Sequence, residues 1–546
     1  MTSITLDIVE AYSLCPRKGF LLLMGEPLGV PHEYVRIIEE QEAVNRQAYR
    51  TSTAGTADAA DGRSLADMMP GQDLILDVAV VAGDLHARCD ALRRGKATAD
   101  QQDCHYEPVK ILGTHRHTKS DVLGLAYVGH VLGEVQGRQP SSGTLGLLDG
   151  RPSKVKLASK YKEVRQILDA LRAWANHPVG DPPPVALNKH CPSCPFRDTC
   201  HQQAEKEDNL SLLDRMTPKL MRKYHDKGIF TIRQLSHIYK PRRSRKKAKR
   251  QVRHSLELQA LAIRTGKVHV EHLPELPRAP VELFLDFEGV PDRDCHYLAG
   301  LLVCRDGEAD YESFWADDDA GEAAMWASLI ERLAVFPDSP VYHYGSYEKK
   351  AFATLAKRHG TGGGFSDRLV NVASSVYGKV YFPVRSNGLK SLGRFLGATW
   401  TDPQAAGLQS LVWRHRWELT RDEQFRQSLV RYNREDCEAV RLLVNRLDQI
   451  RRDAVSDPTI EFANRPKRHA TEAGTALHDQ FERILISAEE GSQGREIRVR
   501  ERDTGEDEPR KRGGRKGHLA YRRVIPSGSY GVPGRYCDEA LDQRFE

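Results

Sequence analysis

The pattern of apolar and polar positions along the chain predicts strands and helices in alternation. Short apolar runs bounded by polar residues are typical of strands, and apolar positions recurring every three or four residues are typical of helices. On this basis, strands are expected at residues 74–81, 85–92, 283–289 and 341–344, and helices at 348–359 and 429–440. Both element types recur over the whole length, so the pattern predicts an α/β multidomain protein.

The stretch 283–289 is an apolar run interrupted by two acids, Asp286 and Glu288. Residues two apart on a strand lie on the same face, so the two carboxylates are expected to project side by side. Burying two ionised carboxylates together is costly unless a cation neutralises them, and Mg²⁺ prefers such oxygen ligands. The alternative is an edge strand whose acids face solvent.

Two later stretches supply further candidate ligands. Glu348 follows the strand-and-turn sequence 341–347, and Tyr432 and Asp436 lie four residues apart in a helical stretch, hence on one helix face. A two-metal nuclease site needs several carboxylates from separate elements converging on a pair of cations. Asp286, Glu288, Glu348 and Asp436 meet that need, and Tyr432 is placed to orient the attacking water.

These motifs resemble a known family. Residues 286–288, 344–348 and 432–436 are similar, in order and spacing, to the motifs of RNase H-like 3′–5′ exonucleases of the DEDD type that use a tyrosine. The resemblance implies an RNase H-like mixed-sheet domain over about 278–450 that binds two Mg²⁺ or Mn²⁺ ions. In that family the second motif usually ends in Asp, where this chain has Glu348, so the ligand set stays open at this position.

Composition is that of a soluble globular protein. The 546 residues predict three or four domains, with 40% hydrophobic and 29% charged residues. No signal peptide and no apolar stretch of about 18 residues is visible, which favours a cytoplasmic protein without membrane contact. The sequence has no Gly-x4-Gly-Lys-Ser/Thr phosphate loop, which argues against an ATP-driven helicase.

Three of the ten cysteines lie close together, at Cys191, Cys194 and Cys200. A disulfide is improbable in a reducing cytosol, and a C-x-x-C pair suggests a metal or cluster site. The fourth ligand is either His201 or the distant Cys15. A lone early cysteine followed by this triplet resembles the iron–sulfur RecB-like PD-(D/E)xK nucleases, including CRISPR-associated ones. The resemblance implies a [4Fe–4S] cluster held by four cysteines; four-thiolate zinc is the alternative.

The enclosed strands then correspond to a RecB-like, restriction-endonuclease-type core. Asp90 stands at that family's first metal-binding acid, and the next strand should carry acid-x-Lys. This chain instead has Glu107, Pro108 and Lys110, with the acid and the lysine three residues apart and so on opposite faces of a regular strand. We interpret the site as degenerate, in a domain that binds DNA without cutting it efficiently. A bulge at Pro108 that realigns the site and keeps it active is the alternative.

Between the two domains lies a basic connector with a small helical hairpin. Residues 217–224 and 231–235 are expected to be helical around a turn at Gly228, which resembles a helix-hairpin-helix or is a plain packing hairpin. A run without acids follows, and it is expected to bind phosphates without sequence preference rather than to be only a solvated face. Its basic candidates are Arg242, Arg243, Arg245, Lys246, Lys247, Lys249 and Arg250.

The sequence therefore predicts a RecB-like domain at 1–205, the connector at 206–275, the exonuclease-like domain at 278–450, and a helical extension with a basic, partly disordered tail at 451–546. The whole order resembles a bacterial group of RecB-like nucleases. The predicted function is a metal-dependent 3′–5′ exonuclease on DNA ends or single strands, with DNA favoured over RNA and a role in DNA repair or mobile-element processing. The rival is a nucleic-acid-binding or recruitment factor built from decayed nucleases.

Overall fold

The computed structural model describes residues 2–53, 58–59, 72–95, 105–176, 181–240, 253–404 and 406–463. The chain divides by its contacts into Met1–Arg465 and Pro466–Glu546, and all described residues belong to the first unit. The predicted basic run at 242–250 and the predicted C-terminal helix and basic tail lie outside the described residues. In the described part, no helix combines the length and the apolar character needed to cross a membrane.

The N-terminal part is built on a mixed seven-stranded sheet of order β2-β3-β4-β5-β6-β7, with β1 pairing in parallel with one end of β4. The strands are β1 (Ile4–Thr5), β2 (Asp58–Ala59), β3 (Leu74–Ala82), β4 (Leu85–Arg94), β5 (Tyr106–Ile111), β6 (Ser142–Gly146) and β7 (Pro152–Lys156). The helices are α1 (Leu6–Leu14), α2 (Pro16–Leu23), α3 (Glu33–Thr53), α4 (Lys119–Gln136) and α5 (Tyr161–Asn176).

The two strands predicted at 74–81 and 85–92 are confirmed as the antiparallel pair β3 and β4. Helix α4 lies between β5 and β6 in the chain, and β6 pairs with β5 in parallel, as a helical crossover allows. A capping box between Thr118 and Asp121 begins α4, and its residues Val122 to Gly133 are all buried. This helix closes the main hydrophobic core of the N-terminal sheet.

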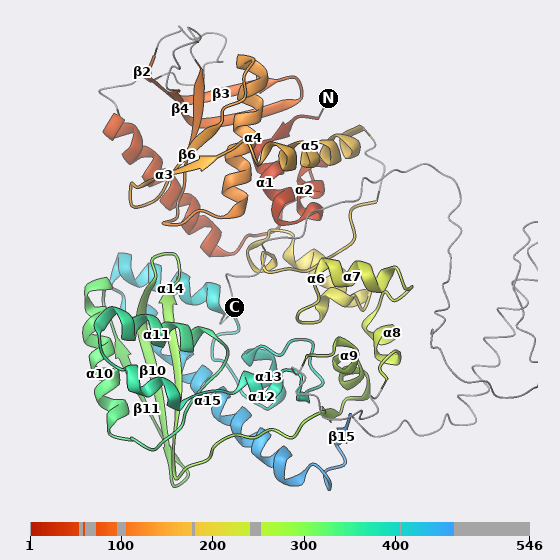
Figure 1. Cartoon of the computed structure of the whole chain (residues 1–546), viewed down its shortest axis with the longest axis vertical. Helices are drawn as coiled ribbons and strands as arrows, with labels where there is room; N and C mark the ends of the chain where they lie inside the picture. The colour runs from red at the N-terminus through yellow and green to blue at the C-terminus, as the bar shows by residue number, and fades with distance from the viewer. Residues whose placement is uncertain are drawn as a thin grey trace, which may run out of the picture. The chain divides into compact units, whose positions relative to one another are not determined.

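A second, five-stranded sheet has the order β11-β10-β9-β12-β13. Its strands β10 and β11 lie side by side (Figure 1). Its strands are β9 (Val281–Val290), β10 (Cys295–Arg305), β11 (Glu308–Trp315), β12 (Val341–His343) and β13 (Leu369–Asn371). The first three are antiparallel, and β12 and β13 run parallel to β9. The flanking helices are α10 (Glu322–Ala334), α11 (Tyr347–His359), α12 (Ala373–Val376), α13 (Leu389–Phe395), α14 (Gly407–Thr420) and α15 (Glu423–Asp453).

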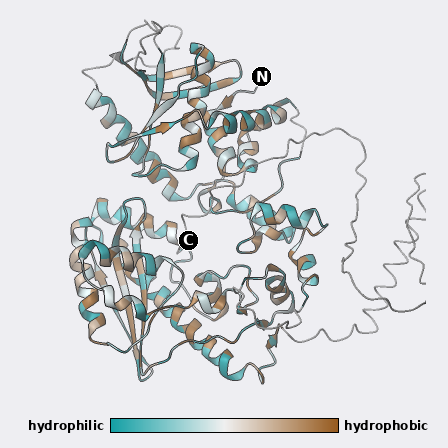
Figure 2. Ribbon diagram, viewed as in Figure 1, coloured by the Kyte–Doolittle hydropathy of each residue, from teal (hydrophilic) through white to brown (hydrophobic). Residues whose placement is uncertain are grey.

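The alternation of residues along β9 divides this sheet into two faces. Leu283, Leu285 and Phe287 pack with α10 and α11 in one core, whereas Phe284 packs with the buried side of α15 in another. Asp286 and Glu288 have the parity of Phe284, so they project toward the α15 face. Helix α15 carries both hydrophilic and hydrophobic residues along its length (Figure 2), as a helix packed on one side requires.

The segment between the two large sheets is helical, as predicted. It contains α6 (Arg197–Lys206), α7 (Pro218–His225), α8 (Ile232–His237) and α9 (Leu256–Thr265), preceded or interrupted by 3₁₀ turns at Cys191–Ser193 and Leu210–Leu212. Helices α7, α8 and α9 share a small core. A three-stranded sheet of order β14-β8-β15 joins β8 (Val268–Val270), β14 (Val380–Tyr381) and β15 (Ile460–Phe462).

Candidate active site

Strand β9 carries the two acids from the interior of the second sheet. It lies between β10 and β12, so the alternative of an edge strand with solvated acids does not apply. Neither acid is exposed, and apolar residues surround them on the same strand. The sheet therefore holds two carboxylates side by side at a position that is only partly open to solvent, where charge is costly.

Helix α15 brings Asp436 to the same place. Asp286, Glu288 and Asp436 each offer an oxygen, and these atoms all lie within 4.8 Å of one another. Tyr432, one helical turn before Asp436, is also buried, as its four-residue spacing predicts. We call Asp286, Glu288 and Asp436 the acid cluster. In the described part of the chain, no other group of three or more His, Cys, Asp or Glu is so tightly gathered.

Charge crowding in the acid cluster shifts the protonation of its members. Burial and then the charge of Asp436 raise the pKa of Glu288 to about 8. Burial, followed by Asp436, Glu288 and Glu348, raises the pKa of Asp286 well above its usual range. The same burial and acids raise the pKa of the Tyr432 phenol, which stays protonated. This is the electrostatic condition of buried carboxylates that lie close to one another.

Several polar side chains for which the sequence predicted no role hold the acid cluster in place. Lys390 Nζ lies 3.1 Å and 3.4 Å from the two carboxylate oxygens of Asp436. Trp400 Nε1 donates to Asp436 Oδ1 at 2.8 Å, and Asn433 Nδ2 donates to Asp286 Oδ2 at 2.7 Å. Asn433 lies within the 432–436 motif, which could have pointed to it. Trp400 follows α13 outside any helix or strand, and its sequence context gave no signal.

Glu348, the fourth predicted ligand, lies beside the acid cluster but not within it. It stands at the start of α11, after a turn in which Gly345 adopts φ +101°, a conformation that favours glycine. Its side chain is buried, and its Oε2 lies 3.3 Å from Nδ1 of the buried His343. Its charge nevertheless contributes to the raised pKa of Asp286. The structure thus gathers three of the four predicted acids tightly and keeps Glu348 next to them.

Residues 283–448 match the family model of the RNase_H superfamily. The matched range begins on β9 and ends in α15, so it contains all five predicted catalytic residues of this RNase H-like region. The match indicates a nuclease-type function with a nucleic acid as substrate. RNase H-like nucleases usually use divalent metal ions, and the acid cluster has the oxygen ligands that such ions need. Among curated proteins, none matches the chain.

The structure places Asp90 and Lys110 of the N-terminal sheet in separate ion pairs. Asp90 accepts from Arg46 Nε at 2.6 Å and from the backbone N–H of Ile111 at 2.7 Å. Lys110 Nζ is paired with Glu10 of α1. The β4–β5 register runs through Pro108 without a shift, so the considered bulge is absent.

Glu107, on the opposite face of β5 from Lys110, accepts instead from Ser142 Oγ at 2.6 Å. The acid and the lysine of the candidate third motif therefore point away from each other, as their spacing predicted. Burial, offset in part by Lys110, raises the pKa of Glu10 to about 7. Charge in this region is balanced by protein side chains, because Arg46 neutralises Asp90 and Lys110 neutralises Glu10.

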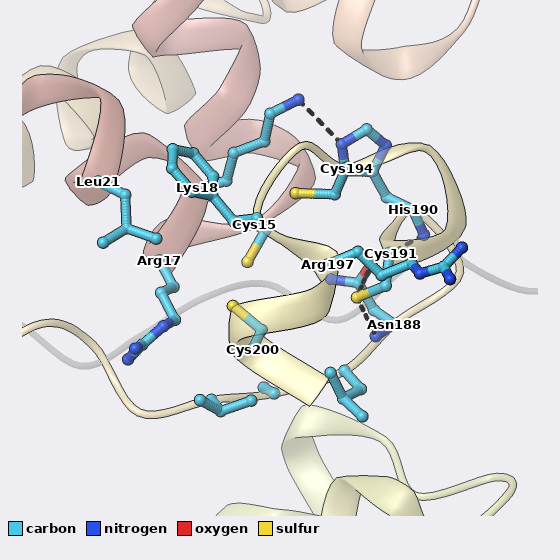
Figure 3. A pocket seen from close by; sticks show the side chains of 14 residues that line it. Cys15, Arg17, Lys18, Leu21, Asn188, His190, Cys191, Cys194, Arg197 and Cys200 are labelled. Atoms are coloured by element: carbon cyan, nitrogen blue, oxygen red, sulfur yellow. Dashed lines mark hydrogen bonds between the residues drawn. The ribbon is translucent and has the colours of Figure 1, made fainter. Parts of the chain in front are cut away.

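The cysteines Cys15, Cys191, Cys194 and Cys200 line one pocket, and their sulfur atoms surround a common space (Figure 3). Cys15 lies between α1 and α2, whereas the other three come from the loop and helix at 191–200. Burial raises the pKa of the thiols of Cys191, Cys194 and Cys200. The charge of Lys18 offsets part of this rise in the pKa of Cys194, and that of Arg17 offsets part of it in Cys200, but the net shift of both is upward.

Neither neighbouring histidine takes the place of the fourth cysteine. His201 is half-exposed, pairs with Glu205 at 3.8 Å and is not among the residues that line the pocket. His190 lines the pocket, but its Nε2 lies 3.0 Å from Lys18 Nζ. Burial and Lys18 lower the pKa of His190 to about 4, so it is neutral and accepts this hydrogen bond. The fold thus brings Cys15, not His201, to the three clustered cysteines.

Proposed function

We propose that the chain is a metal-dependent nuclease, a 3′–5′ exonuclease that hydrolyses phosphodiesters at DNA ends or in single strands. The single observation that carries this proposal is the acid cluster, three carboxylates within 4.8 Å on the interior of an RNase H-like sheet, beside a buried tyrosine. DNA is the preferred substrate, and a cytoplasmic role in DNA repair or mobile-element processing fits the activity.

The donor set fits divalent cations. Asp286, Glu288 and Asp436 would hold Mg²⁺ or Mn²⁺, and Glu348, whose charge acts on Asp286, is the proposed fourth ligand. When bound, two such ions supply a hydroxide nucleophile and offset the negative charge that develops on the phosphoryl group. The raised pKa values of Asp286 and Glu288 support this reading, because one ammonium, that of Lys390, cannot neutralise three carboxylates.

The chain's own residues would hold and orient the reacting groups. Asn433 fixes the carboxylate of Asp286, and Trp400 fixes that of Asp436, so neither has to reorganise when a ligand arrives. His343 holds Glu348, with its Nδ1 at 3.3 Å from Glu348 Oε2. Tyr432 stays protonated, so its phenol can donate a hydrogen bond to the attacking water and direct it at the phosphorus.

The test is degradation of single-stranded DNA, duplex DNA and single-stranded RNA by the full chain with Mn²⁺. Each strand is labelled at its 5′ end in one sample and at its 3′ end in another, which reads out polarity. We expect the wild type to shorten 5′-labelled DNA progressively and release 3′ label at once, and Asp286→Asn with Asp436→Asn to do neither. A wild type that binds all three substrates but cuts none would favour the rival, a binding factor built from decayed nucleases.

For residues 1–205 we propose a RecB-like PD-(D/E)xK domain that binds nucleic acid without cutting it. The order of a helix, three antiparallel strands, a helix and a parallel strand supports the resemblance. The ion pairs of Asp90 with Arg46 and of Lys110 with Glu10 support the loss of cleavage, because they use the side chains that a metal site would need. The basic residues 242–250 would add phosphate contacts.

For the four cysteines we propose a [4Fe–4S] cluster held by Cys15, Cys191, Cys194 and Cys200. When bound, the cluster supplies a covalent link between the start of the chain and the loop at 191–200. A tetrahedral zinc site with Zn–S bonds of about 2.3 Å brings its sulfurs to about 3.8 Å from one another. No three of these four sulfur atoms all lie within 4.8 Å of one another. This wider spacing favours the larger cluster over zinc.

A further inference from the structure

A groove lies between strand β11 and the first half of α15, outside the acid cluster. Residues that line it include Tyr311, Ser313, Arg426, Gln427, Arg431 and Arg434. We call these residues the arginine groove. Its floor is formed by the outermost strand of the five-stranded sheet, and its wall is formed by the helix that also carries Tyr432 and Asp436.

The strand register fixes the distance between this groove and the acid cluster. Asp286 on β9 pairs with Gly300 on β10, and Gly300 pairs with Ser313 on β11. The three positions are directly opposite one another, so they share a face of the sheet. Two strand spacings separate Asp286 from Ser313, which is about 10 Å. The arginine groove therefore flanks the acid cluster on the same side of the sheet.

A chain of hydrogen bonds connects the two places. Tyr311 donates to Asn433 Oδ1 at 2.8 Å, and Asn433 Nδ2 donates to Asp286 Oδ2 at 2.7 Å. Asn433 can lie between them because Gly300 has no side chain: a Cβ at this position would stand 1.6 Å from Asn433 Oδ1. The floor of the groove and the first acid of the site are thus joined through one buried amide.

The charge of the groove is positive. Three arginines line it against a single acid, Glu423, which lies 3.6 Å from Arg426. Arg431 is exposed and has no ion-pair partner within the described part of the chain, and Arg434 pairs at 3.0 Å with Glu438 outside the groove. Guanidinium groups bind phosphate through two parallel hydrogen bonds, and phosphodiesters are therefore the ligand class that such a surface recognises.

A second groove on the same helix shows that the positive charge is not a general property of α15. It is lined by residues that include Arg446, Arg452 and Asp453, and it is similar in size to the arginine groove. There, however, Arg446 pairs with Asp457 at 3.4 Å and Arg452 pairs with Asp448 at 3.4 Å. The two grooves are similar in size, but among the described residues only the arginine groove has an arginine without an ion-pair partner, Arg431.

We propose that the arginine groove binds backbone phosphates of the substrate strand, a few nucleotides away from the phosphodiester at the acid cluster. This inference rests on the proposed nuclease function and deepens it. The groove gives affinity for the strand without reading bases, because it presents guanidinium groups to phosphates and no arrangement specific for base edges. It also makes longer strands better substrates than short ones.

The test compares the full chain carrying Arg426→Gln with Arg431→Gln and a matched control carrying Arg446→Gln with Arg452→Gln. Binding of a fluorescent 20-nucleotide single strand is measured by anisotropy in EDTA over a range of salt concentrations. We expect the groove variant to bind about tenfold more weakly than wild type. Its log–log salt slope should fall by about 1.4, from two lost phosphate contacts. The control should bind as wild type does; equal binding by both variants would overturn the proposal.

A second measurement separates this inference from the nuclease proposal. The p-nitrophenyl ester of thymidine 5′-monophosphate is too short to reach the groove, so its Mn²⁺-dependent hydrolysis depends on the acid cluster alone. We expect the groove variant to hydrolyse the ester within twofold of wild type while its KM for the 20-nucleotide strand rises at least fivefold. Ester hydrolysis that falls in parallel with strand degradation would contradict a phosphate-binding role. If the wild type hydrolyses neither substrate, the nuclease proposal is refuted. If the groove variant nevertheless binds the strand more weakly than the wild type does, phosphate binding by the arginine groove is still supported.

Discussion

Lys390 Nζ lies between the two carboxylate oxygens of Asp436, at 3.1 Å and 3.4 Å, and above the rings of Tyr432 and Trp400, with centroids at 4.1 Å and 4.9 Å. The Lys390 side chain is three-quarters buried. Its positive charge acts against the raised pKa of both Asp286 and Glu288, so it partly offsets the charge of the acid cluster.

Replacing Lys390 with Met should have opposite effects on the metal-free and the metal-bound protein. Without metal, the acid cluster loses its neutralising charge, and we expect the free energy of unfolding to fall by about 1–2 kcal/mol. With Mn²⁺, a repulsive charge is removed, and the affinity should rise roughly tenfold. Thermal unfolding in EDTA and calorimetric titration measure the two effects. Lys390→Arg keeps the charge and should behave as wild type; Mn²⁺ affinity unchanged in Lys390→Met would contradict this role.

The raised pKa of Glu288 makes the stability of the metal-free protein depend on pH. Its pKa rises from 4.5 to about 8 on folding, so between these values the folded state binds more protons than the unfolded state. Stability is therefore greatest at the acid end of this window and falls as the pH rises through it. We expect the melting temperature in EDTA to decline from about pH 5 to pH 8, with a shallower decline in Glu288→Gln. Parallel curves for the two proteins would argue against this assignment.

The ion pair of Lys110 with Glu10 tests whether the N-terminal site is catalytic. Lys110→Met leaves Glu10 buried without its cation, and we expect a loss of about 1–3 kcal/mol of stability. Strand degradation should be unaffected. The matched control is Lys154→Met, because Lys154 is 71% exposed and lies 3.8 Å from Glu107, so neither property should change. Loss of degradation by a folded Lys110→Met protein would restore the N-terminal domain as a nuclease.

The cysteine pocket predicts which thiols matter for cofactor content. Cys15→Ser and Cys194→Ser each remove one of four ligands, so we expect anaerobically purified protein to lose its iron and its brown iron–sulfur absorption. Cys304→Ser serves as the control, since Cys304 lies on β10 and does not line the pocket, so this variant should keep its full iron content. Colourless wild-type protein that contains stoichiometric zinc would refute the cluster.

The sequence predicted the acid-bearing strand and helix because their patterns are local. Alternation along 283–289 placed Asp286 and Glu288 on one face, and the four-residue spacing placed Tyr432 and Asp436 on one side of a helix. The strands and helices expected around them are observed, including the turn at Gly345. These features depend on two periodicities that operate over a few residues, and such signals survive without knowledge of the tertiary structure.

Features that depend on distant contacts were not visible in this way. Nothing local linked Lys390 or Trp400 to Asp436, because their approach is fixed by how α13 and the following loop pack against α15. The choice between Cys15 and His201 was open for the same reason, since Cys15 arrives from a helix pair more than 170 positions earlier. Strands of two or three residues such as β14 and β15 are too short to show a period.

The central claim is that Asp286, Glu288 and Asp436 form a divalent-cation site, and Mn²⁺ binding to the full chain tests it most directly. Free Mn²⁺ is followed by electron paramagnetic resonance while wild type, Asp286→Asn with Asp436→Asn, and the exposed control Asp310→Asn are titrated. We predict saturable binding in the wild type and the control, and loss of that binding in the double variant. Equal Mn²⁺ binding by all three proteins would contradict the account.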